Sequence, residues 1–154
     1  MAGNVVRCQY CWRGYRVLAV ASEAPRCGDC EQPLPWVARA DEQSFTEAIT
    51  MVSVPVVVDL RASWAGPCRL ASPVLDRIAR ERAGLLKLLR VDVDEAPRLS
   101  RLLSVETLPT LVVMRDGEVL ARRAGAASAA AFRRWVREAL SVAVPAPERE
   151  PALR

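Results

Sequence analysis

Two Cys-x-x-Cys pairs near the N-terminus constrain this chain more than any other feature of its sequence. Cys8 and Cys11 form the first pair, Cys27 and Cys30 form the second, and fifteen residues separate the two pairs. This spacing is typical of a zinc ion held by four thiolates, a ligand set that leaves the metal no open position for water or substrate. We therefore expect residues 1–40 to form a small unit around a structural zinc.

Other readings of the four cysteines are two disulfides, four free thiols, or iron in place of zinc. A reducing cytoplasm disfavours disulfides, and about 40 residues are too few for a stable core without a metal or cross-links. The stretch 12–26 is long enough for a hairpin that returns the second pair to the first, with a short strand over 16–20. We expect Gly28 to supply unusual backbone angles for the second turn.

The charge pattern and the missing histidines exclude several function classes. The net charge of +4 is spread thinly, and the chain has no histidine, so Ser–His and Cys–His nucleophiles and histidine metal ligands are excluded. Aromatic and basic residues alternate between Tyr10 and Arg16, but so modest a charge makes nucleic acid an unlikely partner. No apolar run reaches membrane-spanning length and no secretory leader is recognisable, so we expect a cytoplasmic protein without a membrane partner.

Hydrophobic periodicity from residue 41 onward predicts alternating helices and strands. Ser44 and Glu47 fit a capping box for a helix to about Met51, and Ser128 fits the cap of a last helix. The elements predicted between them are strands over 54–60, 86–93, 110–114 and 119–122, and helices over 67–83 and 97–103. This order predicts an α/β fold with a mixed central sheet and helices on both faces. We expect 37–40 to be a linker, 41–143 to be the larger domain and 144–154 to be a disordered tail.

Three motifs in the larger domain carry a resemblance to a known family. They are the run from Val57 to Cys68, Leu-Pro-Thr at 108–110 and Asp-Gly-Glu at 116–118. With these motifs, residues 43–143 resemble thioredoxin, and the preceding cysteine pairs narrow the resemblance to the bacterial zinc-ribbon thioredoxins of the second-thioredoxin type. The resemblance implies a thioredoxin fold preceded by a zinc-ribbon domain. It also implies protein-disulfide reduction, with disulfide-containing or extended peptide segments as substrates and thioredoxin reductase as a partner.

The chain departs from the family at the active-site motif Trp-Cys-Gly-Pro-Cys. Residues 64–68 read Trp-Ala-Gly-Pro-Cys, so Ala65 stands where the resemblance places the attacking cysteine. Because exchange begins with a thiolate that attacks a disulfide sulfur, this motif cannot cycle between dithiol and disulfide. One hypothesis is a disulfide reductase disabled by an engineered or natural replacement. The alternative is a natural redox-inactive module that binds peptides or acts as a chaperone.

The resemblance also assigns roles to the remaining site residues. Cys68 matches the resolving cysteine, and Asp59 matches a buried acid that assists proton transfer. If neither residue has a functional role, Cys68 is a small buried apolar residue and Asp59 is a buried acid bonded to backbone or water. Arg61 stands where the family usually has tryptophan. The peptide groove would comprise Trp64, Gly66, Pro67, Thr107 and Pro109, with Pro109 as the family's cis-proline.

Overall fold

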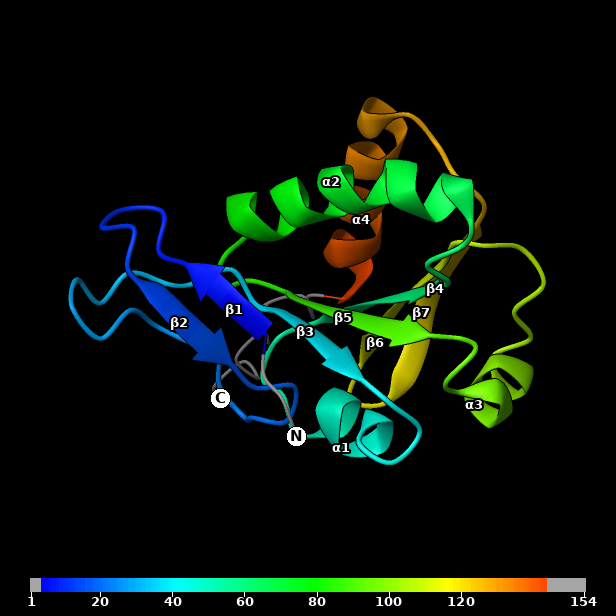
Figure 1. The fold of residues 1–154 in the computed structure, drawn as a ribbon, viewed down its shortest axis with the longest axis horizontal. Helices are drawn as coiled ribbons and strands as arrows, with labels where there is room; N and C mark the ends of the chain where they lie inside the picture. The colour runs from blue at the N-terminus through cyan, green and yellow to red at the C-terminus, as the bar shows by residue number, and fades with distance from the viewer. Residues whose placement is uncertain (1–3, 144–154) are drawn as a thin grey trace, which may run out of the picture.

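The computed structural model describes residues 4–143, which form a short hairpin followed by an α/β domain (Figure 1). The hairpin pairs two antiparallel strands of four residues each, β1 and β2. The elements run in the order β1 (Asn4–Arg7), β2 (Gly14–Val17), β3 (Val37–Ala40), α1 (Phe45–Thr50), β4 (Val56–Arg61), α2 (Gly66–Glu81), β5 (Lys87–Asp92), α3 (Pro97–Leu102), β6 (Thr110–Arg115), β7 (Glu118–Ala124) and α4 (Ala129–Ala143).

Five strands form the central sheet in the order β3-β5-β4-β6-β7. The first three run parallel to one another, while β6 and β7 are antiparallel to their neighbours. The sheet is therefore mixed, and the predicted α/β fold is confirmed. The turn between β6 and β7 is the predicted Asp-Gly turn, in which Asp116 and Gly117 have φ angles of 53° and 81°. Both residues are left-handed, as a tight type I′ hairpin requires.

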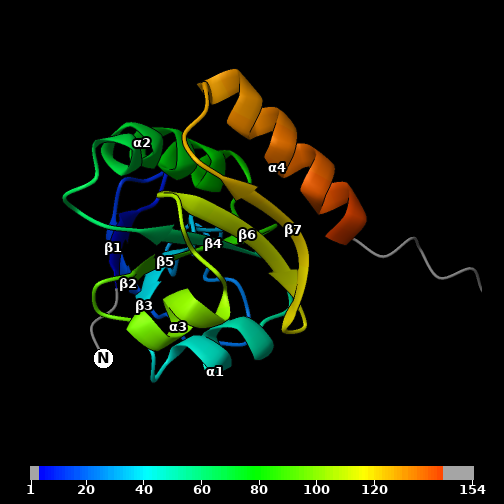
Figure 2. The same cartoon turned by 90° about the vertical axis from the view of Figure 1, so that its right-hand side faces the viewer.

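Alternation along the strands divides the apolar residues between the two faces of the sheet. On β4, Val56 and Val58 belong to one buried cluster, whereas Val57 belongs to the other. Helices α2 and α4 cover the face of Val57, and α1 and α3 lie on the opposite face (Figure 2). Burial on both faces explains why β4 reads as a continuous apolar run, because strands covered on both sides need no polar face.

The hairpin unit, by which we mean β1 and β2 together with the second Cys-x-x-Cys pair, shares its core with the face of the sheet that α1 covers. Cys8 and Cys27 belong to the same buried cluster as Trp36 and Phe45. Trp36 is fully buried and its indole nitrogen donates a hydrogen bond to the Leu18 carbonyl oxygen at 3.0 Å. The cysteine-bearing segment is therefore packed onto the larger domain through apolar burial as well as hydrogen bonds.

Lys87, the only lysine in the chain, lies fully buried at this junction. Its ammonium donates hydrogen bonds to the carbonyl oxygens of Ala19 and Ala48, the latter at 2.8 Å. It also lies 4.5 Å from the centroid of the Trp36 ring, within cation–π range. One charged side chain at the start of β5 therefore connects the hairpin unit, helix α1 and the sheet.

Two local predictions are wrong. The predicted linker at 37–40 is the edge strand β3, because its backbone pairs with Leu88–Val91 of β5. The predicted capping box is not formed, since Ser44 makes no side-chain cap bond to α1. Instead, the Asp41 carboxylate accepts hydrogen bonds from the backbone N–H groups of Gln43 and Ser44 and from the Ser44 hydroxyl. Asp41 thus orders the turn that leads into the helix.

The predicted cap of the last helix is confirmed, because Ser128 Oγ accepts a hydrogen bond from the Ala131 backbone N–H at 3.1 Å. The predicted disordered tail, 144–154, lies outside the described residues. Within 4–143, none of the helices combines the length and apolar character needed to cross a bilayer.

Candidate functional site

The two Cys-x-x-Cys pairs meet in one cluster. All four sulfur atoms lie within 4.8 Å of one another, and the Cys8–Cys30 and Cys11–Cys27 sulfur pairs are each 3.5 Å apart. These separations exceed the roughly 2.05 Å of a disulfide bond, and all four residues are free cysteines. Four sulfurs placed tetrahedrally at about 2.3 Å from zinc would lie about 3.8 Å apart, so the cluster fits such an ion.

The two cysteine turns have nearly the same backbone geometry. Cys8 Sγ accepts a hydrogen bond from the Tyr10 N–H at 3.4 Å, and Cys27 Sγ accepts one from the Asp29 N–H at 3.4 Å. The residue after each pair, Trp12 or Glu31, is left-handed with a φ of 64°. The prediction for Gly28 is wrong, because its φ is not positive and the left-handed position comes three residues later. Each turn therefore directs backbone N–H groups at sulfur.

The electrostatics of the cluster favour a bound cation. The Tyr15 hydroxyl, 3.3 Å from Cys27 Sγ, is the main cause that lowers the pKa of Cys27 to about 6. A backbone bond from Gln32 favours the Cys30 thiolate, but burial and the neighbouring sulfurs together raise the pKa of Cys30 to about 12. Four thiolates cannot share this space without positive charge among them, and a divalent metal would supply it.

The second group of predicted residues lies around the start of α2. Ala65 is the N-cap residue, and the predicted Pro67 stands in the first turn, where a missing N–H has no cost. Cys68 is 2 % exposed and packs with Ala62 and Ala65, and Leu108 lies against the same cluster. The loop before β6 therefore packs against the first turn of α2.

Cys68 and Asp59 are both buried, and the charge of Asp59 acts on the Cys68 thiol. Burial is the main cause that raises the pKa of the Cys68 thiol, and the negative charge of Asp59 adds to it. Burial likewise raises the pKa of Asp59, although the positive charge of Arg90 opposes it. Arg90 Nε lies 3.5 Å from Asp59 Oδ2, while Asp59 Oδ1 is buried without a hydrogen-bond partner within 4–143. Both groups are thus biased toward their neutral, protonated forms.

The surface above the pair is partly aromatic. Trp64 is 66 % exposed, and its indole nitrogen donates a hydrogen bond to Asp94 Oδ2 at 2.7 Å. The Leu108–Pro109 peptide bond is cis, as predicted. Thr107 is exposed, and its carbonyl oxygen accepts a hydrogen bond from the Thr110 hydroxyl at 2.6 Å. Gly66 is half-buried and Pro67 is exposed at the same helix end.

Sequence reasoning missed the charged partners of these residues. Arg90 forms a 2.9 Å ion pair with Asp76 and donates a hydrogen bond to the Ser72 carbonyl oxygen. Asp94 holds the Trp64 ring. The only available signal was Arg90 between the apolar residues Leu89 and Val91 of β5, and that signal does not reveal which acid faces the arginine.

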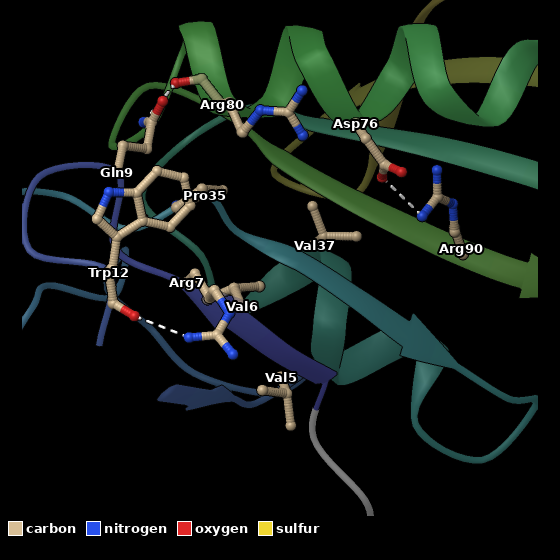
Figure 3. Close-up of a pocket in the computed structure, with 10 residues that line it drawn as sticks. All are labelled: Val5, Val6, Arg7, Gln9, Trp12, Pro35, Val37, Asp76, Arg80 and Arg90. Carbon is tan, nitrogen blue, oxygen red and sulfur yellow. Dashed lines mark hydrogen bonds and ion pairs between the residues drawn. The ribbon is translucent and has the colours of Figure 1, made fainter. Parts of the chain in front are cut away.

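A cleft of about 720 Å³ separates the hairpin unit from α2 (Figure 3). Gln9 crosses it at one end and donates a hydrogen bond to the Arg80 carbonyl oxygen at 3.0 Å. At the wall formed by β1, Arg7 donates a hydrogen bond to the carbonyl oxygen of the exposed Trp12. The cleft therefore follows the boundary between the hairpin unit and α2. Its lining includes neither the four clustered cysteines nor Cys68.

Comparison with known proteins agrees with this geometry. The sequence model of the thioredoxin family matches residues 36–138, which is more than half of the chain. The thioredoxin of Mycobacterium bovis is 38% identical over 96 residues, covering 62% of this chain and 83% of that protein. Thioredoxin C-3 of Corynebacterium nephridii is 33% identical over 119 residues, which cover 75% of this chain and 81% of that protein. The chloroplastic M-type thioredoxin of Triticum aestivum is 31% identical over 107 residues, which cover 68% of this chain and 61% of that protein. The chain therefore belongs to the thioredoxin family, a family of thiol–disulfide oxidoreductases.

Proposed function

We propose that this chain is a thioredoxin-family protein whose active site cannot perform dithiol exchange. In this proposal Ala65 occupies the position of the attacking cysteine, at the N-cap of α2. A cysteine at a helix N-terminus has a lowered pKa, because the helix dipole and the free N–H groups stabilise the thiolate. Alanine offers neither a sulfur nor a charge, so no mixed disulfide with a substrate can form at this position.

The remaining thiol of the motif is a poor substitute. Cys68 is 2 % exposed, and its pKa is raised by burial and by Asp59. The other four cysteines of the chain are gathered in the N-terminal cluster, which does not include Cys68. Cys68 therefore has no second thiol with which to complete a two-electron cycle. This isolation of Cys68 is the observation that carries the proposal.

The direct test restores the missing sulfur. We expect Ala65→Cys to accelerate the reduction of insulin disulfides by dithiothreitol, while the parent chain adds nothing to the reductant alone. Ala65→Ser is the matched control, because it adds a polar atom of similar size without a thiol. If the cysteine variant folds, keeps its metal and remains as inert as the parent, the disulfide reductase activity does not transfer to this chain.

A second candidate is a peptide-binding or chaperone module that uses the same surface without redox chemistry. It is favoured by Trp64, which stays 66 % exposed while Asp94 fixes its ring. An exposed, oriented aromatic ring beside the Leu108–Pro109 loop suits an extended peptide, including a disulfide-containing segment. Suppression of aggregation by the parent, lost in Trp64→Ala, would favour this candidate. If both proteins behave alike, this surface does not bind the client.

The N-terminal cluster completes the proposal. We expect Cys8, Cys11, Cys27 and Cys30 to hold one structural zinc, with the zinc-ribbon domain over 1–40 and the thioredoxin-like domain over 41–143. Metal analysis of the purified chain should find one zinc per molecule, and Cys11→Ser should lower that content. Iron in the cluster, or no metal, would contradict this assignment. Four reduced thiols suit a reducing compartment such as the cytoplasm, where thioredoxin reductase would be the partner of an active relative.

A further inference from the structure

A small cationic cavity lies where the three parallel strands end. It measures about 350 Å³ and is lined by Arg39, Arg61, Ser63, Arg90 and Asp92, which we call the arginine pocket. Strands β3, β4 and β5 all point toward this edge of the sheet (Figure 1). The carboxyl ends of parallel strands are a common place for ligand sites in α/β folds.

Strand register brings the arginines together. Arg39 on β3 is the direct Cα partner of Arg90 on β5, and Arg61 on β4 is the partner of Asp92. Residues directly opposite on one face of a sheet are close neighbours, and like charges in that position are destabilising. Arg90 has Asp59 as its partner on the other side, in β4, so Arg39 is the member of the like-charged pair whose register partner carries no negative charge.

The acids near the pocket equal its arginines in number, but they do not form an ion pair with every arginine. Arg90 is engaged by Asp59 and Asp76 on the α2 side. Asp92 Oδ1 accepts a hydrogen bond from the Asp94 N–H at 2.8 Å. Among residues 4–143, neither Arg39 nor Arg61 has a side-chain hydrogen bond or ion pair. Arg39 and Arg61 line the cavity, and the donors of their guanidinium groups are therefore available to a ligand.

We propose that the arginine pocket binds the phosphoryl group of a small anion. A guanidinium group presents a planar fork of donors that matches phosphate oxygens, and two unpaired guanidinium groups suit a doubly charged group. The exposed Ser63 adds a hydroxyl donor at the rim, immediately before Trp64. Arg61 is the last residue of β4, two residues after Asp59, and it sits where the resemblance places a tryptophan. The proposal does not depend on any redox activity.

The test uses the full zinc-loaded chain and pyrophosphate as the probe, in calorimetric titrations at constant ionic strength. We expect saturable binding by the parent, weakened at least about tenfold in Arg39→Gln and in Arg61→Gln, because each loses a charge-assisted contact. Arg134→Gln is the matched control: it makes the same change in net charge at an exposed position on α4, and we expect its affinity to stay within about twofold.

A second measurement locates the ligand without relying on variants. Pyrophosphate should shift the backbone amide resonances of Arg39, Ser63 and Asp92 in the parent. No saturable binding up to about 10 mM, equal weakening in all three variants, or shifts confined to other regions would overturn the proposal. Citrate serves as a polycarboxylate of comparable charge. If citrate binds more tightly than pyrophosphate, the assignment to a phosphoryl group is wrong.

Discussion

Lys87→Met should abolish a specific dependence of stability on pH. Burial lowers the pKa of Lys87 from 10.5 to about 8, whereas the unfolded chain keeps the ordinary value. Between these two pH values the unfolded state binds more protons than the folded state, so the free energy of unfolding rises as pH rises through that window. The cause lies in the fold, because the ammonium is fully enclosed by the hairpin unit, α1 and Trp36.

The size of the effect follows from the two pKa values. The gap corresponds to about 3 kcal/mol in total, of which roughly 2.5 kcal/mol falls between pH 7 and pH 10. The assay is urea unfolding of the zinc-loaded parent and Lys87→Met at several pH values across that range. Because the two proteins share every other titrating group, the difference between their unfolding free energies isolates Lys87.

We expect the stability of the parent relative to the variant to increase by that amount from pH 7 to pH 10. A difference that stays flat would refute the reasoning, whatever the absolute stabilities. Since the chain has a single lysine, the side-chain nitrogen resonance of Lys87 can be followed directly by NMR. It should titrate near pH 8, and a midpoint near 10.5 would show that burial does not penalise the charge.

Three further predictions concern the sites. Asp59→Asn should make the free energy of unfolding less dependent on pH. Because burial raises the folded-state pKa of Asp59, the parent should lose stability relative to the variant as pH rises from 4 to 7, and urea unfolding of both proteins at these two pH values checks this; a difference that does not change with pH would contradict a raised pKa. Cys68 should react with iodoacetamide at pH 8 at least about tenfold more slowly than a free cysteine, because it is buried and its pKa is raised; a rate equal to that of the free thiol would contradict the burial argument. Removal of zinc by a chelator should expose the amides of β1 and β2 to hydrogen exchange while β4 and β6 stay protected, and equal deprotection of all four strands would mean that the metal supports the whole chain.

Elements with strong periodicity were predictable from sequence. The apolar run of β4 and the Asp116–Gly117 turn each carry a local signal that the structure bears out. The cysteine spacing predicted one four-sulfur cluster, because two such turns can close around a single ion. Strands β1 and β3 were missed because four residues are too few to establish a period. The partner of β1 lies across the first cysteine turn, in β2, and the partner of β3 lies far along the chain, in β5.

The remaining errors come from contacts that only the tertiary structure defines. Ser44 and Glu47 matched a capping box, but the Asp41 carboxylate was near enough to take the N–H groups of the turn. The burial of Lys87 could not be predicted from the sequence, because it depends on the carbonyl groups of Ala19 and Ala48, which lie far from it along the chain. The arginine pocket depends on strand order, since Arg39 and Arg90 become neighbours only when β3 pairs with β5.

The most direct test of the central claim is a redox titration of Cys68. The zinc-loaded parent and Ala65→Cys are equilibrated in glutathione buffers of graded potential, quenched in acid, and analysed by mass spectrometry for disulfides within the chain. We predict that the parent never forms an intramolecular disulfide at Cys68, whereas Ala65→Cys passes through one two-electron transition as two hydrogens are lost. A disulfide that joins Cys68 to another cysteine of the parent would contradict the account.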